Sequence, residues 1–273
     1  MSLLEVADLR VSFPGRGWRA KRVEVLHGVS LDVSHGETLG LVGESGSGKT
    51  TIGRAVLGLV KPSGGEITFG GETITHLSAR DRRRLAKDIQ VVFQDPYTSL
   101  NPSLTVGDIL AEPLVVQGAT AKDARARVRT LLDQVGLPAD AAERLPREFS
   151  GGQRQRVAIA RALAPEPKLI VCDEPVSALD LSTQERVLDL FIDIQRSTGV
   201  AYLFVSHDLS VVRHISHRVA VLYRGDLVET GQAAQVTSAP EHSYSQRLLL
   251  AAPVADPILQ RERREERRRL AAA

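Results

Sequence analysis

Residues 38–51 of the chain read TLGLVGESGSGKTT and hold its most informative pattern. The run 38–42 is short and almost wholly apolar, as is typical of a strand buried on both faces of a parallel sheet. A loop rich in glycine and serine follows at 43–48, and a helical pattern covers 49–60. This order predicts a loop whose backbone N–H groups, together with a helix N-terminus, close around a phosphate.

The loop fits the phosphate-binding pattern G-x-x-x-x-G-K-[ST] from Gly43 to Thr50. In this pattern the lysine, here Lys49, reaches the β- and γ-phosphates of a nucleotide, and the hydroxyl of Thr50 ligates Mg²⁺. The alternative is a plain glycine-rich turn, which is disfavoured because the flanking strand and helix both fit. The residues expected to hold the phosphates are Gly43, Ser45, Gly46, Ser47, Gly48, Lys49, Thr50 and Thr51.

A second apolar strand ends in two carboxylates, within the segment LIVCDE at 169–174. We expect Asp173 to hold Mg²⁺, directly or through water, and Glu174 to polarise the water that attacks the γ-phosphate. Taken alone, an acidic pair after a strand is more often a helix cap or a solvated turn. Its place downstream of a phosphate loop favours the catalytic interpretation.

Residues 149–153 read FSGGQ and precede the segment RQRVAIARAL. Ser150 and the two glycines predict the start of a helix over 152–163, with free N–H groups that attract an anion. The segment closely resembles the signature motif of ATP-binding-cassette (ABC) ATPases, and the resemblance extends through nearly the whole chain. It implies an α/β fold with a P-loop (RecA-like) ABC ATPase core, an antiparallel β subdomain and an inserted α-helical subdomain.

The same resemblance implies roles for further residues, with ATP and Mg²⁺ as ligands. Gln94 in VVFQD matches the Q-loop glutamine, which touches the metal or the attacking water. His207 in VSHD matches the switch histidine that contacts the γ-phosphate, and Asp180 in SALD belongs to the D-loop. The signature residues implied to close over ATP held by a second chain are Ser150, Gly151, Gly152 and Gln153. Glu174, His207 and Gln94 are the implied catalytic residues, and Thr50, Gln94 and Asp173 the implied metal ligands.

Phe13 occupies the place where the family has an aromatic residue that stacks on adenine. Leu9, Val11 and Phe13 share one face of the predicted first strand, so a plain core phenylalanine is the alternative. Trp18, in the insert that follows, is a competing aromatic.

Strands that alternate with helices predict a largely parallel sheet, interrupted from about 95 to 149 by helix and turn patterns. The predicted organisation has three parts. They are a nucleotide-binding α/β core with a β subdomain over 1–94 and 164–238, a helical subdomain with the signature motif over 95–163, and a C-terminal extension with an Arg-rich tail over 239–273.

Residues 91–110 and 239–257 resemble the ATPase subunits of dipeptide, oligopeptide and nickel importers. The extension has the sequence HSYS at 242–245, where the family commonly has a His-Pro-Tyr-Thr-like element, and a generic docking helix is the alternative. The resemblance implies ATP-driven uptake of a peptide-like solute through separate integral-membrane permease subunits. It further implies a second ABC ATPase chain, an extracytoplasmic solute-binding protein as an indirect partner, and a peripheral place on the cytoplasmic face of the cell membrane.

Two other classes of ABC protein compete with the importer. One is a non-transport ATPase of a soluble complex, of the carbon–phosphorus lyase accessory type, which shares the catalytic motifs. The other is a translation factor or DNA-repair ATPase, which is disfavoured by a single cassette and a body that is close to neutral.

Charge and composition exclude several other classes. The net charge is +2, but residues 261–269 contribute +3, so the rest of the chain is near −1 and a nucleic-acid partner is not expected. This basic segment is expected to be a solvated helix or tail, with contact to anionic lipid as the alternative. The single cysteine, Cys172, forms no intrachain disulfide, and neither a signal peptide nor an apolar run of 18 residues is evident.

Overall fold

The computed structural model describes residues 2–15 and 21–251 of the chain. They form two compact units, one from the described parts of 1–76 and 204–273 and the other from 77–203. Trp18 and the basic segment 261–269 lie outside the described residues, and the predicted domain boundaries stay predictions. Within the described ranges, no helix combines the length and hydrophobicity that crossing a membrane requires.

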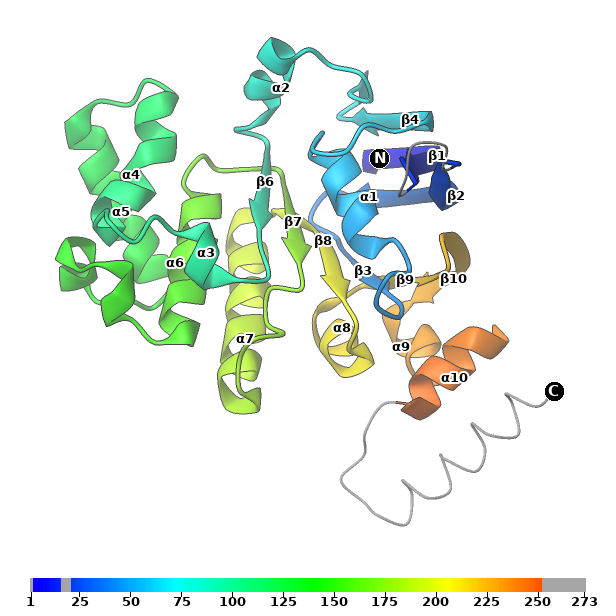
Figure 1. The fold of residues 1–273 in the computed structure, drawn as a ribbon. Helices are drawn as coiled ribbons and strands as arrows, with labels where there is room; N and C mark the ends of the chain where they lie inside the picture. Colours follow the sequence, from blue (N-terminus) through cyan, green and yellow to red (C-terminus); the bar gives the residue numbers. More distant parts are fainter. Residues whose placement is uncertain (1, 16–20, 252–273) are drawn as a thin grey trace. The chain divides into compact units, whose positions relative to one another are not determined.

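The first unit contains an antiparallel sheet with the strand order β2-β1-β4-β5 (Figure 1). Strand β1 pairs with β2 on one side and β4 on the other, so that Leu4 lies opposite both Val33 and Phe69. Leu4, Val6, Leu9 and Val11 of β1 are buried in a core, and the pairing with β2 shifts register between Val6 and Leu9. The strands are β1 (Ser2–Phe13), β2 (Val23–Ser34), β4 (Gly64–Phe69) and β5 (Glu72–Thr73). This sheet confirms the predicted antiparallel β subdomain.

The first unit also holds part of a larger sheet. Its order is β10-β9-β3-β8-β7-β6, with β3 parallel to β9 and β10 antiparallel to β9. All five residues of β3 are buried, as the apolar run predicts. The strands of this part are β3 (Thr38–Val42), β9 (Arg218–Tyr223) and β10 (Asp226–Gln232), and β8 (Ala201–Ser206) spans the division between the units; the helices are α1 (Lys49–Val56), α8 (Leu209–Ile215), α9 (Ala233–Val236) and α10 (Ser243–Ala251).

Helix α1 ends earlier than the sequence predicts, at Val56 and not at residue 60. Gly58 has a φ of 71°, in the left-handed region, and its N–H donates to the Ala55 carbonyl. The N–H of Leu59 donates to the Arg54 carbonyl at 2.8 Å. This pair of bonds is a Schellman motif, which stops the helix at the glycine and corrects the predicted boundary.

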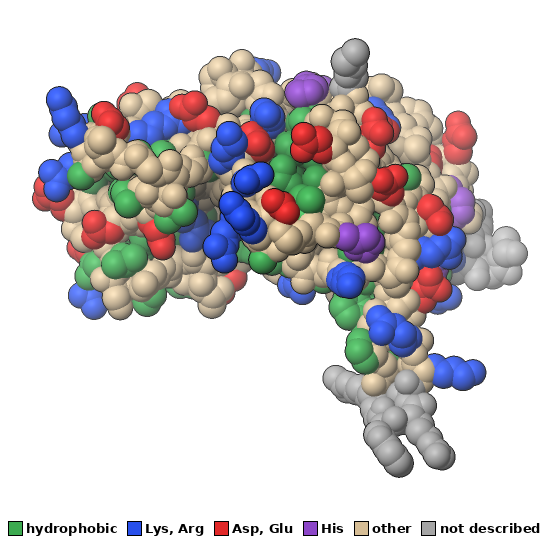
Figure 2. Space-filling view, turned by 90° about the horizontal axis from the view of Figure 1, so that it is seen from above, with side chains coloured by type: hydrophobic (Ala, Val, Ile, Leu, Met, Phe, Trp, Pro, Cys, Tyr) green, Lys and Arg blue, Asp and Glu red, His purple; other side chains and the backbone are tan. Residues whose placement is uncertain are grey.

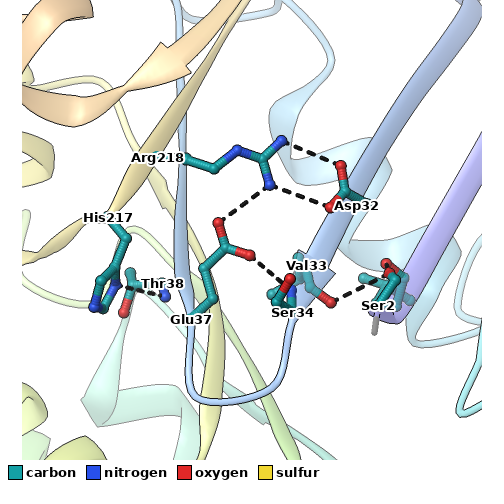
Figure 3. A network of polar contacts seen from close by, with 9 residues as sticks. Ser2, Asp32, Val33, Ser34, Glu37, Thr38, His217 and Arg218 are labelled. Carbon is teal, nitrogen blue, oxygen red and sulfur yellow. Dashed lines mark hydrogen bonds and ion pairs between the residues drawn. The ribbon is translucent and has the colours of Figure 1, made fainter.

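A polar network fixes the turn that leads into β3 (Figure 3). The Arg218 guanidinium donates to both carboxylate oxygens of Asp32, at 3.1 and 3.2 Å, and to Glu37 at 3.2 Å. The bond to Asp32 raises the pKa of Arg218. Glu37 accepts the Ser34 N–H at 2.7 Å, and the Thr38 N–H donates to His217 Nδ1 at 3.0 Å. Strand β9 is thereby joined to the end of β2 and to the first residue of β3.

The second unit contains the parallel strands β6 and β7 and most of the helices, of which α4, α5 and α6 pack on one another (Figure 1). Thr105, Thr120 and Ser150 cap α4, α5 and α6 by accepting a backbone N–H three residues later. The elements are β6 (Ile89–Val92), β7 (Leu169–Asp173), α2 (Ala79–Leu85), α3 (Pro96–Ser99), α4 (Val106–Val116), α5 (Ala121–Gln134), α6 (Gly151–Leu163) and α7 (Leu181–Thr198), with 3₁₀ turns at Ala139–Glu143 and Pro146–Glu148.

Basic and acidic side chains lie among one another on the face drawn in Figure 2, with a group of basic side chains near its middle. Helix α2 contains four arginines in its seven residues. Arg84 pairs with Asp81 of the same helix at 3.9 Å. Exposed pairs of this kind contribute little to stability. Because none of its residues is buried, α2 is a surface helix.

Candidate nucleotide-binding and hydrolysis site

The phosphate loop joins β3 to α1, and Lys49 is its most constrained side chain. Lys49 is only 4% exposed, and its ammonium donates to the carbonyls of Gly43 at 2.7 Å and Glu44 at 2.9 Å. The Glu44 carbonyl also accepts the Ser47 N–H at 3.2 Å, which closes the turn of the loop. The loop therefore holds a positive charge directly beside its own curved backbone.

The start of α1 offers an anion site. Its N-cap residue, Gly48, provides no side-chain hydrogen bond to the first-turn N–H groups, and the buried Ser47 hydroxyl has no hydrogen-bond partner. A Cβ on Gly48 would lie 2.6 Å from Leu26 Cδ2, so a capping side chain cannot replace the glycine without a shift. Uncapped N–H groups, a partnerless buried hydroxyl and an adjacent ammonium suit a nucleotide phosphate.

The remaining predicted residues of the first unit lie in the loop, in the first turn of α1, after β8 and at the end of β1. Ser45 and Gly46 are exposed, and Thr50 and Thr51 are half-buried in the first turn of α1. His207 is exposed directly after β8, and Phe13 is 39% exposed at the end of β1. Phe13 is thus no plain core residue, and its adenine contact stays a prediction.

In the second unit, Glu174 follows β7 and meets the Q-loop glutamine. Gln94 Nε2 lies 3.4 Å from Glu174 Oε2 and 3.2 Å from the Ser177 hydroxyl oxygen. That hydroxyl in turn donates to the Glu174 carbonyl at 3.0 Å. Asp173, the last residue of β7, is half-buried. The structure therefore brings together Gln94, Glu174 and Ser177. Gln94 lies far from the other two in the sequence, so the sequence alone does not indicate this contact.

The backbone at Glu174 is strained. Its φ is 50°, in the left-handed region that residues with a side chain seldom adopt. This conformation costs about 1–2 kcal/mol for an L-residue. Strain of this kind is typical of active sites, where it fixes the direction in which a side chain leaves the chain.

The signature segment begins α6 with a capping box. The Gln153 N–H donates to the Ser150 hydroxyl at 3.3 Å, and the Ser150 N–H donates to the Gln153 side chain at 2.9 Å. Gly152 is buried, and a Cβ there would lie 2.3 Å from Thr183 Cγ2 on α7. The Arg154 guanidinium lies over the ring of Tyr97, 3.9 Å from its centroid, which connects the signature helix to the segment after Gln94.

Asp180 caps α7. Its carboxylate accepts the Thr183 N–H at 3.0 Å and the Ser182 hydroxyl at 2.8 Å. The bonds from Ser182 and Thr183 lower the pKa of Asp180 to about 2. The D-loop aspartate is therefore ionised near neutral pH and sets the start of α7, the helix against which Gly152 packs.

The phosphate loop belongs to the first compact unit, and the Gln94–Glu174 group belongs to the second. Among residues 2–15 and 21–251, no cluster of three or more His, Cys, Asp or Glu side chains could hold a metal ion. The predicted Mg²⁺ ligands Thr50, Gln94 and Asp173 are a hydroxyl, an amide and a single carboxylate. Oxygen donors of these kinds are the ones that Mg²⁺ prefers in proteins, where it takes its other ligands from phosphate and water.

Residues 26–177 match the model of a family described as ABC transporter. The chain belongs to the ABC transporter family. ABC cassettes bind ATP with Mg²⁺ and hydrolyse ATP, which confirms the predicted ligands and the ATPase class. The roles of the individual site residues remain predictions.

Two similar relatives of this ABC chain are the glutathione import ATP-binding proteins GsiA of Shigella flexneri serotype 5b (strain 8401) and Escherichia coli (strain K12). Each is 52% identical over 267 residues, which cover 96% of the chain and 43% of the relative. The chain thus spans less than half the length of these relatives. The similarity confirms the predicted resemblance to importer ATPases of the peptide and nickel type.

Two solved structures confirm the P-loop ABC fold. The dimeric ATP-binding cassette MJ0796, in a post-hydrolysis state with ADP and Pi, has a TM-score of 0.75 and 29% identity and covers 84% of this chain and 98% of its own. The cbiO1 protein of Clostridium perfringens, part of the cbiONQ ABC transporter complex, has a TM-score of 0.78 and 27% identity, with coverage of 90% and 95%.

Sequence reasoning missed one contact of the phosphate loop. Tyr244 of α10 accepts the Glu44 N–H, although 200 residues separate the two in sequence. The extension element HSYS is evident in the sequence, but no pattern within it indicates a contact with residue 44.

Proposed function

We propose that the chain is the ATP-binding and ATP-hydrolysing subunit of an ABC importer, which drives uptake of a peptide-like solute through a separate membrane permease. The observation that carries the proposal is the phosphate loop, in which Lys49, the partnerless Ser47 hydroxyl and the uncapped α1 form an anion site. The importer class is supported by the relatives, which are named for import of glutathione, a tripeptide.

Each predicted residue has a part in this proposal. Lys49 turns from the Gly43 and Glu44 carbonyls to the β- and γ-phosphates, and backbone N–H groups of residues 45–51 surround them. Thr50, Gln94 and Asp173 would hold Mg²⁺, which would screen the phosphate charge. His207 contacts the γ-phosphate, and Phe13 stacks on adenine.

Hydrolysis is assigned to Glu174. Its carboxylate polarises a water whose oxygen attacks the γ-phosphorus, while the bond from that phosphorus to the bridging oxygen of ADP breaks. The water proton passes toward the carboxylate as the bond to phosphorus forms. Gln94, within hydrogen-bonding distance of Glu174, orients this carboxylate.

The proposal includes a second ABC ATPase chain that completes the sites. In ABC proteins the phosphate loop of one cassette faces the signature segment of another across a dimer. Ser150, Gly151, Gly152 and Gln153 of one chain close over the ATP of the other, and Asp180 lies at the same interface. The dimer of the similar cassette MJ0796 supports this arrangement.

We assign the chain to the cytoplasmic face of the cell membrane, in complex with permease subunits and, through them, with a solute-binding protein. The relatives favour this assignment over a carbon–phosphorus lyase accessory ATPase. The test is uptake of radiolabelled glutathione and of a labelled dipeptide by cells that lack the gene and carry either the wild type or Glu174→Gln. We expect only the wild type to restore uptake of one of them. Recovery of the chain in a soluble lyase-type complex, with uptake unaffected by its loss, would contradict the importer.

A further inference from the structure

Helix α10 of the C-terminal extension reaches the phosphate loop through one side chain. The backbone N–H of Glu44, the second residue of the loop, donates to the Tyr244 hydroxyl oxygen at 2.9 Å. Tyr244 is only 2% exposed, so water does not compete freely for this bond.

The Tyr244 ring is held in place by an apolar cluster and by a second aromatic ring. It packs in a cluster with Val42, the residue before the loop, and with Leu209 and Val212 of α8. It also contacts the ring of Tyr223, with centroids 4.1 Å apart and planes inclined by 32°. Burial raises the pKa of Tyr244, so its hydroxyl stays protonated and neutral at ordinary pH.

The start of α10 is tied to β10. The carboxylate of Glu229 accepts the N–H groups of Glu241 at 2.8 Å and His242 at 3.1 Å, and His242 Nδ1 accepts the Tyr244 N–H at 3.1 Å. These bonds fix the turn that delivers Tyr244 to the loop. The hydroxyl is therefore a preset acceptor and not the end of a freely rotating side chain.

The hydrogen bond to Tyr244 is made by Glu44, the residue whose carbonyl also accepts a hydrogen bond from Lys49. The Glu44 carbonyl accepts bonds from Lys49 Nζ and the Ser47 N–H, while its N–H is held by Tyr244. Both backbone polar groups of Glu44 are thus occupied in the loop. When Lys49 leaves the carbonyl for a phosphate, the bond to Tyr244 still holds the entrance of the loop in its curved form.

We propose that Tyr244 is a positioning residue of the nucleotide site, whose hydroxyl preorganises the phosphate loop for ATP. The C-terminal extension then belongs to the nucleotide site as well as to the surface of the protein. The proposal rests on nucleotide binding at this loop. A role in core packing alone is the competing explanation, and it needs the ring but not the hydroxyl.

The test compares Tyr244→Phe, which keeps the ring and removes the hydroxyl, with Val236→Ala, which opens the same apolar cluster without touching the loop. Steady-state ATPase kinetics and thermal unfolding are measured for both. We expect Tyr244→Phe to raise KM for ATP about fivefold to tenfold with kcat within twofold, as loss of one buried hydrogen bond predicts. Val236→Ala should lower Tm at least as much and leave KM unchanged.

A KM within twofold of wild type in Tyr244→Phe, or an equal rise in Val236→Ala, would overturn the proposal. Amide hydrogen exchange of the wild type without nucleotide provides a second measurement that needs no variant. The Glu44 N–H should be protected, and exchange at the rate of an open loop would contradict the contact. Lys49→Ala tests nucleotide binding separately, because retained binding in that variant would refute the loop assignment and not the role of Tyr244.

Discussion

Gln94 Nε2 lies 3.4 Å from Glu174 Oε2, and the same nitrogen lies 3.2 Å from the hydroxyl oxygen of Ser177. The amide of the Q-loop thus contacts the carboxylate that is proposed to activate water. A metal or nucleotide ligand that draws Gln94 away would change the setting of Glu174. The contact links the Q-loop directly to the residue that is proposed to activate water.

Gln94→Ala should therefore slow hydrolysis more than it weakens binding. The change removes the amide that lies 3.4 Å from the Glu174 carboxylate and is proposed to orient it. We expect kcat to fall about tenfold or more, with the affinity for a fluorescent ATP analogue within threefold of wild type. Gln117→Ala, at an exposed helix end, is the control and should change neither quantity. Unchanged kcat in Gln94→Ala would refute the orienting role.

Lys49→Ala should lose nucleotide binding itself. The substitution removes the ammonium that donates to the Gly43 and Glu44 carbonyls and that is proposed to bind the phosphates. A charge-assisted hydrogen bond between an ammonium and a phosphate contributes about 1.5–3 kcal/mol. Titration with the fluorescent analogue should show affinity reduced about 10- to 100-fold. Lys87→Ala removes an exposed lysine outside the loop and serves as the control. Equal affinities for the two variants would show that this loop is not the phosphate site.

Gly152→Ala should destabilise the second unit by overpacking. The added Cβ would lie 2.3 Å from Thr183 Cγ2, whereas a Cβ on Gly151 meets Leu179 only at an ordinary 3.7 Å. We expect Gly152→Ala to cost about 1–3 kcal/mol in urea unfolding and Gly151→Ala to be tolerated. Adding Thr183→Ser to Gly152→Ala removes the clashing methyl and keeps the hydroxyl, so it should restore most of the loss. Failure of this rescue would place the strain elsewhere.

Asp180→Ala should lower stability in a way that depends on pH. Because the pKa of Asp180 in the folded chain is about 2, below its usual 3.8, the ionised cap stabilises α7 fully above pH of about 4. That contribution declines as pH falls from 4 toward 2. We expect a Tm about 2–4 °C below wild type at pH 7, with a smaller gap at pH 3.

Asp193→Ala is the matched control for this prediction, since Asp193 lies on the same helix in an exposed pair with Arg196. It should change Tm by less than Asp180→Ala. A gap between wild type and Asp180→Ala that widens on acidification would contradict the assigned sign.

The strands and helices near strong local signals could be predicted from the sequence. The apolar run before the loop gave β3 at its observed bounds, and Ser150 placed the start of α6 to within one residue. These features depend on neighbours within a few positions, as do caps and buried strands. The end of α1 was the exception, because Gly58 stops the helix before the apolar pattern does.

Contacts between distant segments could not be read in the same way. Gln94 was expected to face the metal or water, but its contact with Glu174 and Ser177 depends on how β6 and β7 pair. The Tyr244 contact depends on the path of the chain after β10, where the Glu229 carboxylate fixes the turn. Neither packing arrangement leaves a periodic signal in the sequence.

The most direct test of the account is Glu174→Gln, because it removes the carboxylate and keeps the shape of the side chain. ATPase rate, ATP affinity and sedimentation with and without ATP–Mg²⁺ are measured on the variant, with Glu185→Gln on α7 as the control. We predict turnover reduced at least 100-fold, ATP affinity retained, and a dimer that forms only with ATP and persists. Turnover at the wild-type rate, or a chain that stays monomeric with bound ATP, would contradict the account.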